Sequence, residues 1–235
     1  MYEKIVNFVI FVIVLFPALV LAGTYQGLWI GQIELDKVNE VASKTDTNTL
    51  QPVKHVFDMT LLLHVDQAGM VRLLKNVTMM QKKEEVDGEN IVRRVLITND
   101  SLLPEYDGIV RRDGKLIGIR LGSLSYDFPT DQTEMPLTGN LSPGNTLECT
   151  IEMDENHPTN PFRHLYHPDH QQGKNITRQI QLTISATQDN NDPDDDQFSL
   201  AGTYQESISG LHKIPIKIAG SFSIQRISEV DVLNQ

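Results

Sequence analysis

Short segments in which apolar and polar residues alternate dominate the chain after residue 22. In the first of them, from Tyr25 to Leu35, every second residue is apolar or glycine. Such a period of two is typical of β-strands with one buried face. Turn residues separate the runs, and no helical period persists for three turns. The pattern therefore predicts an all-β fold of about ten antiparallel strands with long loops, either a single β-barrel or a sandwich.

The clearest local prediction is a β-hairpin formed by residues 57–65 and 71–79. The short segment Asp66-Gln67-Ala68-Gly69 joins these two alternating runs, and a short turn with glycine near its end suits a hairpin. The charged run 82–90 is expected to end this pair. Residues 39–54 are polar and include a proline, which predicts a loop. Later strands are expected at 91–98, 146–153, 176–186, 198–208 and 214–227.

Trp29 and Arg226 favour closure of the sheet into a barrel. Trp29 lies on the apolar face of the first strand, and Arg226 falls on the apolar face of the last. An arginine on an inward face needs a partner, and an indole ring is a good one. We therefore expect the two strands to be neighbours, with these side chains within cation–π range.

Gly27-Leu28-Trp29 together with Arg226 resembles the pattern of lipocalin-like barrels. In that family a Gly-x-Trp on the first strand packs against an arginine from the end of the barrel. The rest of the family's pattern is not found in this chain, so its ligand chemistry is not carried over. The resemblance implies a structural role for Trp29 and Arg226.

Residues 1–22 have the three parts of a secretory signal. Lys4 is followed by an apolar run from Ile5 to Phe16, and small residues precede an expected cleavage site after Ala22. An uncleaved anchor is the alternative, but the apolar stretch is short for a membrane span. We expect a single β-rich domain at 23–235, exported to the periplasm or the exterior, with no integral membrane span after cleavage.

The charge and the cysteine count narrow the range of partners. The net charge of −11 opposes binding to nucleic acid or anionic lipid. Cys149 is the only cysteine, so an intramolecular disulfide cannot form, which fits a bacterial exported protein better than a disulfide-stapled secreted domain. Its place on the apolar side of an alternating run predicts a buried thiol rather than a nucleophile.

Several segments resemble parts of large, secreted, multi-module bacterial proteins. They are GLWIGQIELDKVNEV, HVDQAGMVRLLKNV, NPFRHLYHPDH, AGTYQESISGL and GSFSIQRIS. The resemblance implies an exported, β-rich, uncharacterised bacterial module, without an assigned activity.

The segment 157–170, HPTNPFRHLYHPDH, contains four of the seven histidines and lies between two predicted strands. Neutral imidazoles with nearby carboxylates are good ligands for zinc, and a catalytic zinc usually keeps three protein ligands and a water. The sequence therefore offers a candidate zinc site. Its possible ligands are His157, His164, His167 and His170.

An alternative interpretation of this segment is structural. Pro168 lies between His167 and His170 and forbids the regular helix that would stack their rings, and the spacing matches no established zinc signature. In a proline-pinned loop, histidine and asparagine side chains would satisfy backbone groups while apolar side chains pack on the rim of the barrel. Those apolar residues are Phe162, Leu165 and Tyr166.

The acidic turn 189–197, DNNDPDDDQ, offers hard oxygen ligands at close spacing, as calcium loops do. It lacks the glycine and the closing glutamate of an EF-hand, and a solvated hairpin tip is the alternative interpretation. The candidate calcium ligands are Asp189, Asp192, Asp194 and Asp196.

The chain contains no Gly-x-Ser-x-Gly, no phosphate-binding glycine loop and no His-Glu-x-x-His. The leading hypothesis is an exported non-enzymatic β-module that binds a protein, a glycan or an apolar ligand, or supports an envelope assembly. The second hypothesis is a metal-dependent protein, such as a hydrolase that uses zinc bound by the segment 157–170. The third is a barrel that holds a small apolar ligand, which a large interior cavity would favour over a filled core.

Overall fold

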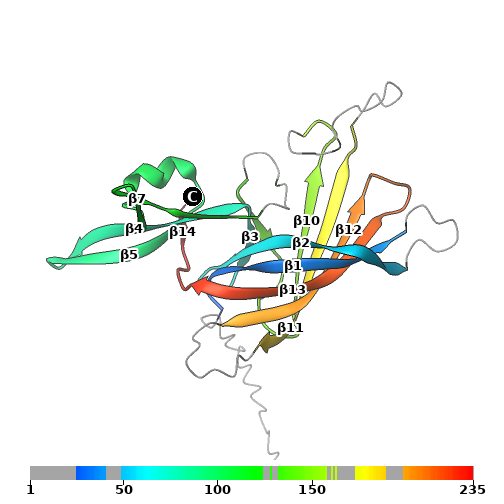
Figure 1. The fold of residues 1–235 in the computed structure, drawn as a ribbon, viewed down its shortest axis with the longest axis horizontal. Coiled ribbons are helices and arrows are strands. Elements are labelled where there is room, and N and C mark those ends of the chain that lie inside the picture. Colours follow the sequence, from blue (N-terminus) through cyan, green and yellow to red (C-terminus); the bar gives the residue numbers. More distant parts are fainter. Residues whose placement is uncertain are drawn as a thin grey trace, which may run out of the picture.

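A computed structural model of the chain describes residues 25–40, 49–123, 128, 132–157, 160, 162, 173–188 and 198–234, without the side chains of 186–188. The described regular structure consists of strands and one short 3-10 helix, η2 (Asp100–Glu105) (Figure 1). The predicted all-β fold is therefore confirmed. No helix in these residues is long and apolar enough to cross a membrane.

The strands differ widely in length, from two residues to sixteen. They are β1 (Gly27–Asn39), β2 (Leu50–Val65), β3 (Val71–Leu74), β4 (Asn76–Val86), β5 (Glu89–Ile97), β6 (Val110–Arg112), β7 (Lys115–Ile117), β8 (Ile119–Gly122), β9 (Glu134–Leu137), β10 (Thr146–Met153), β11 (Ile176–Gln188), β12 (Ser199–Ser209), β13 (Ile216–Ser228) and β14 (Leu233–Asn234).

The larger sheet has eight strands in the order β10-β11-β12-β13-β1-β2-β3-β9. Its two edge strands approach each other through one isolated bridge, in which Thr138 and Glu148 exchange backbone hydrogen bonds of 2.8 and 2.9 Å. A single bridge is not a continuous ladder, so the sheet is strongly curled but is not a closed barrel.

The first and the last long strands are neighbours, as Trp29 and Arg226 predicted. β1 pairs antiparallel with β13, and Trp29 lies opposite Arg226 in the register. Phe198 completes the group: its ring centre lies 5.7 Å from that of Trp29 and 5.7 Å from the guanidinium carbon of Arg226. The structure therefore shows a cation–π contact between Arg226 and Phe198. The sequence had suggested Trp29 as the aromatic partner.

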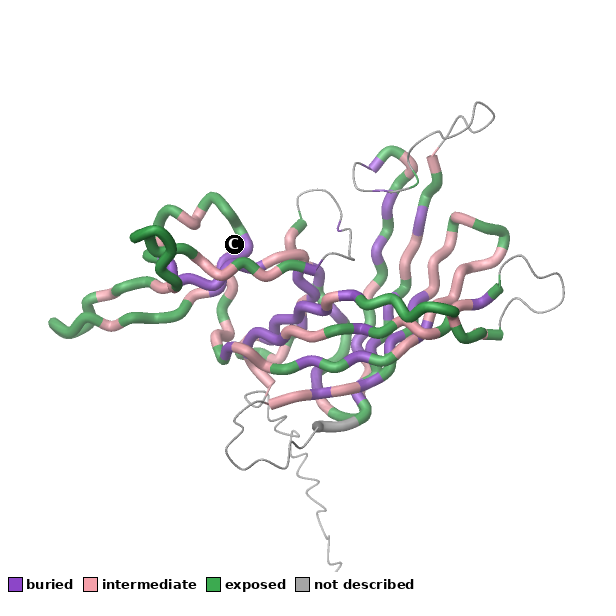
Figure 2. The backbone as a smooth tube through the Cα atoms, in the orientation of Figure 1, coloured by how far each residue is buried: buried purple, intermediate pink, exposed green. Residues whose placement is uncertain are grey.

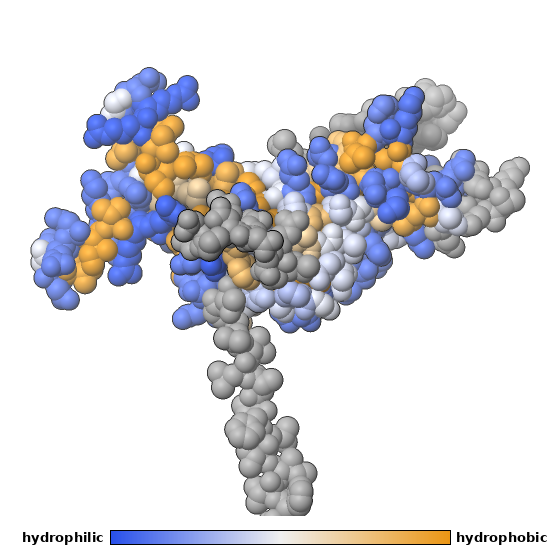
Figure 3. Space-filling view, turned by 60° about the horizontal axis from the view of Figure 1, so that its bottom comes forward, coloured by the Kyte–Doolittle hydropathy of each residue, from blue (hydrophilic) through white to orange (hydrophobic). Residues whose placement is uncertain are grey.

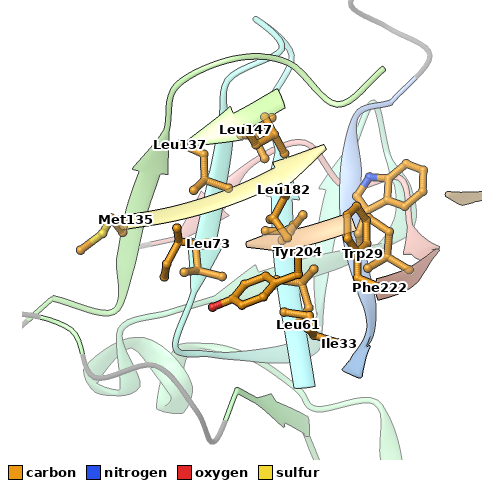
Figure 4. Close-up of a cluster of buried hydrophobic side chains, with 14 of the residues drawn as sticks. Trp29, Ile33, Leu61, Leu73, Met135, Leu137, Leu147, Leu182, Tyr204 and Phe222 are labelled. Atoms are coloured by element: carbon orange, nitrogen blue, oxygen red, sulfur yellow. The ribbon is translucent and has the colours of Figure 1, made fainter. Parts of the chain in front are cut away.

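The concave face of the larger sheet encloses a densely packed apolar core (Figure 4). Trp29 and Tyr204 are fully buried there, and Phe222 packs its ring over the backbone of Gly202, where an added Cβ would lie 2.6 Å from a ring carbon. The described core is filled by large side chains, which disfavours an apolar ligand inside the sheet.

A second apolar cluster joins the larger sheet to a smaller one. The smaller sheet has the order β14-β5-β4-β8, and its buried residues pack against Leu28 and Leu62 on the convex face of the larger sheet. This explains why β2 is buried on both faces from Leu61 to Val65. Figure 2 shows buried residues concentrated where the sheets meet, and exposed ones along the projecting hairpins.

The predicted hairpin at 57–79 is confirmed only for its first part. β2 pairs with β3 as expected, but the second run breaks at Lys75, where the chain passes from the larger sheet into the smaller. Lys75 donates its N–H to Thr133 at 2.8 Å and accepts from the N–H of Ser123 at 2.8 Å. These bonds satisfy the backbone at the crossing point.

Two predicted boundaries are wrong. β2 already begins at Leu50, inside the expected loop 39–54. The charged run 82–90 does not end a strand pair but forms the outer part of the β4–β5 hairpin. Its turn is Asp87-Gly88, with φ of 54° and 81°, the left-handed geometry that favours Asp-Gly in two-residue hairpin turns.

Candidate functional site

The predicted zinc loop is described only in part. His164, His167 and His170 lie outside the described residues. His157 is buried, with 8% exposure, and its backbone N–H bonds to the carbonyl of Asp154 at 3.1 Å. Within the described ranges, no three histidine, cysteine or acidic side chains form a group that could hold a metal ion. Zinc binding by this loop stays a prediction.

Hydrogen bonds from the Asn160 side chain connect the two ends of this loop. Its side-chain amide donates to the carbonyl of Asp154 at 2.8 Å and to that of Lys174 at 2.6 Å, while its side-chain oxygen accepts from the N–H of Phe162 at 2.8 Å. The asparagine is 1% exposed. This is the local satisfaction of backbone groups that the structural interpretation expects, although Phe162 itself is exposed.

The acidic turn is not described. Asp189, Asp192, Asp194 and Asp196 all lie between Gln188 and Phe198, outside the described residues, so calcium binding there also stays a prediction.

A buried polar network lies inside the larger sheet. Arg178 on β11 donates from Nε to Glu206 Oε1 at 2.5 Å, and the Tyr204 hydroxyl donates to Glu206 Oε2 at 2.8 Å. The Glu206 side chain is 2% exposed and that of Arg178 12%. A buried carboxylate needs such partners. This network was not predicted from the sequence, although Arg178 and Glu206 each occupy a position on the apolar face of their strand.

Cys149 lies beside this network, packed against the core. Burial raises the pKa of its thiol to about 11, opposed in part by the positive charge of Arg178. A thiol with this pKa stays protonated at neutral pH and is a poor nucleophile. Cys149 is only partly buried, less than the sequence predicted, but the raised pKa supports the prediction that its thiol is not a nucleophile.

His64 is fully buried between the two sheets. Its Nε2 lies 3.1 Å from the carbonyl of Val230 and must carry the hydrogen, because a carbonyl only accepts, while Nδ1 has no hydrogen-bond partner among the described residues. Burial lowers the pKa of this histidine below its usual 6.5, and the bond to Val230 counteracts this in part. His64 was not singled out from the sequence, although it interrupts the otherwise apolar run from Leu61 to Val65.

A cleft with a volume of about 680 Å³ lies where the two sheets meet. Three separate segments contribute to it: the start of β4, the residues that lead from the end of β5 into η2, and the residues that lead into β9. Its lining is predominantly polar and consists of Asn76, Thr98, Asn99, Asp100, Gln132, Thr133, Glu134 and Pro136.

An arginine lies beside each of the two carboxylates of this cleft. Asp100 accepts from Arg120 at 2.7 Å, and Glu134 lies 3.5 Å from Arg72, which also pairs with Asp66 at 2.9 Å. The cleft therefore presents neutral amides and hydroxyls together with two carboxylates that already have an arginine partner. We refer to it as the junction cleft.

Asn99 has a fixed orientation in the junction cleft. Its side-chain oxygen accepts from the N–H and the hydroxyl of Ser101 at 3.0 and 2.7 Å, which caps η2. The side-chain nitrogen is then the group left to donate to a ligand.

No family model matches the chain, and comparison with curated proteins finds no match. The function is therefore inferred from the geometry of the clefts and surfaces.

Proposed function

We propose that the chain is an exported, non-enzymatic β-module that binds an uncharged carbohydrate in the junction cleft. The observation that carries this proposal is the cleft of about 680 Å³ at the meeting of two sheets, with polar side chains converging from three segments. Ligand sites occur preferentially at such junctions, where a few polar groups fix the orientation of the ligand.

The chemistry of the lining favours a ligand rich in hydroxyl groups. Asn76 and Gln132 each offer an amide with two donors and an acceptor, and Asn99 offers the donors of its side-chain nitrogen. A sugar hydroxyl both donates and accepts, so neighbouring hydroxyls match such side chains. The paired states of Asp100 and Glu134 favour a neutral ligand over an ionic one.

The packing of the larger sheet argues for binding at this surface rather than in the interior. Trp29, Tyr204 and Phe222 fill the described core and are at most 3% exposed. Of the functions that the sequence left open, a lipocalin-like carrier of an apolar ligand is therefore less well supported than a glycan-binding module. Export and a bacterial envelope setting remain part of the proposal, through the signal predicted at 1–22.

A glycan array tests the proposal. The wild-type protein should bind a restricted set of uncharged glycans, and the double variant Asn76→Ala/Gln132→Ala should bind them at least about tenfold more weakly, because two hydrogen-bonding amides are lost. The matched control is Gln179→Ala/Gln205→Ala, which removes two amides from the smaller cleft on the outer face of β11 and β12.

Two results would count against carbohydrate binding in the junction cleft. Binding that survives in the first variant and disappears in the control would move the site to the outer face of the sheet. Absence of binding to any glycan on the array would contradict the proposal.

A further inference from the structure

The outer edge of β5 is an open strand edge. In the smaller sheet β5 lies between β4 and β14, but β14 pairs only with Leu96 and Ile97 at the end of β5. Among the described strands none pairs with residues 89–95 on that side. An unpaired edge of this kind presents backbone N–H and C=O groups to any chain that can align with it.

The opposite edge of the same hairpin is closed. β8 pairs with β4 from Asn76 to Met79. Beyond β8, the backbone N–H of Asp107 donates to the carbonyl of Gln81 at 2.8 Å, and the Asp107 carboxylate accepts from the N–H of Lys83 at 3.2 Å. Strand addition to this hairpin can therefore use the β5 side but not the inner part of the β4 side.

The outer hairpin also lacks support from the rest of the fold. Most residues from Lys82 to Arg94 are exposed, and the side chain of Val92 is 51% exposed. Figure 3 shows apolar strips bordered by hydrophilic side chains on the two projections at the left, where the β4–β5 and β6–β7 hairpins lie in Figure 1. An isolated two-stranded ribbon is marginally stable, and a wider sheet would stabilise it.

The residues along this edge are complementary to themselves. If two β5 strands pair antiparallel about a two-fold axis at Ile91, Ile91 lies opposite its own copy and Glu89 lies opposite Arg93, twice. Opposite charges in this position stabilise a strand pair. An axis at Arg93 would instead place two arginines opposite each other, which is unfavourable.

The existing ion pairs of the hairpin are compatible with this register. Arg93 already lies 3.7 Å from Glu84, which in turn lies 3.3 Å from Lys82. In the paired arrangement Arg93 would stand between Glu84 of its own copy and Glu89 of the other. Positive and negative groups then alternate across the interface.

We propose that the β5 edge is a homodimer interface, in which two copies of the chain pair antiparallel along residues 89–93 and extend the smaller sheet. The occupant is a second copy because the sequence Glu89-Asn90-Ile91-Val92-Arg93 is charge-complementary to its own antiparallel partner. The interface is small, so the dimer is weak and reversible. This inference goes beyond the proposed glycan binding and does not depend on it.

Sedimentation velocity on the wild-type chain, from about 5 to 200 μM at about 0.15 M salt, which screens the repulsion between two net charges of −11, tests the interface. The sedimentation coefficient should rise with concentration. Arg93→Glu should weaken it at least about tenfold, since Glu89 would then face a like charge. The double variant Glu89→Arg/Arg93→Glu restores opposite charges and should restore dimerisation.

Arg94→Glu is the matched control. Arg94 lies on the other face of β5, opposite Gly88 of the second copy in the proposed register, so its charge reversal should leave the dimer largely intact. Thermal melting of each variant checks that the monomer is folded. A wild-type chain that stays monomeric at 200 μM would overturn the proposal, as would a double variant that fails to dimerise or an Arg94→Glu variant that loses dimerisation equally.

Discussion

At the scale of single residues, the buried ion pair between Arg178 and Glu206 has the most direct effect on stability. Glu206→Gln should lower the free energy of unfolding by about 3 kcal/mol, because Arg178 would keep its charge in a largely buried position. The double variant Arg178→Met/Glu206→Leu removes both charges and should recover most of this loss. Urea unfolding measures both; equal stability of Glu206→Gln and wild type would show that the pair is energetically neutral.

His64 should make stability depend on pH. Its pKa in the folded state is below 6.5 because of burial, so the unfolded chain binds more protons between the two pKa values, and stability is lost as pH falls through that window. His64→Leu should lose less stability than the wild type between about pH 7.5 and pH 5.5. His212, which is exposed, provides the control: His212→Gln should keep the wild-type dependence. Identical curves for His64→Leu and wild type would contradict the assignment.

At the scale of secondary-structure elements, the Asp87-Gly88 turn determines whether the outer β4–β5 hairpin forms. Gly88 has a φ of 81°, and the space where a Cβ would lie is open. Gly88→Val should therefore lower the free energy of unfolding by about 1–2 kcal/mol, because valine disfavours this left-handed backbone conformation and not because its side chain clashes. Hydrogen exchange of amides in 82–94 should then speed up. Gly122→Ala, at a glycine without positive φ, should leave these amides protected. If both variants exchange alike, the turn does not control the hairpin.

Alternation in the sequence predicted the long strands of the larger sheet, in which one face is buried and the other is solvated over much of the length. It could not show that the run 71–79 changes sheets at Lys75, because the apolar positions on both sides of this single lysine keep the same parity. The alternation pattern also failed to predict the strands in 82–90. A projecting hairpin needs no buried face, and its charged residues are equally typical of a loop. The Asp-Gly pair in that run was the available signal.

The pairing of Trp29 with Arg226 could be predicted because Arg226 is a charged residue on the apolar face of its strand and Trp29 is a suitable partner on the apolar face of another. The same reasoning, applied to Arg178 and Glu206, would have found the buried network. The junction cleft could not be predicted: Asn76, Thr98 and Gln132 are ordinary polar residues in their local sequence, and only the packing of the two sheets brings them together.

At the scale of the whole molecule, the meeting of the two sheets links the fold to the proposed function. The apolar contacts that join the smaller sheet to Leu28 and Leu62 also hold the walls of the junction cleft in place. The cleft should therefore be preformed, and glycan binding should require little rearrangement.

The most direct test is NMR titration of the isotope-labelled protein with a glycan selected on the array, following the side-chain NH₂ signals of asparagine and glutamine. The signals of Asn76, Asn99 and Gln132 should shift on binding, whereas those of Gln179 and Gln205 should stay in place. Shifts confined to the outer-face glutamines, or to residues away from both clefts, would contradict carbohydrate binding at the junction.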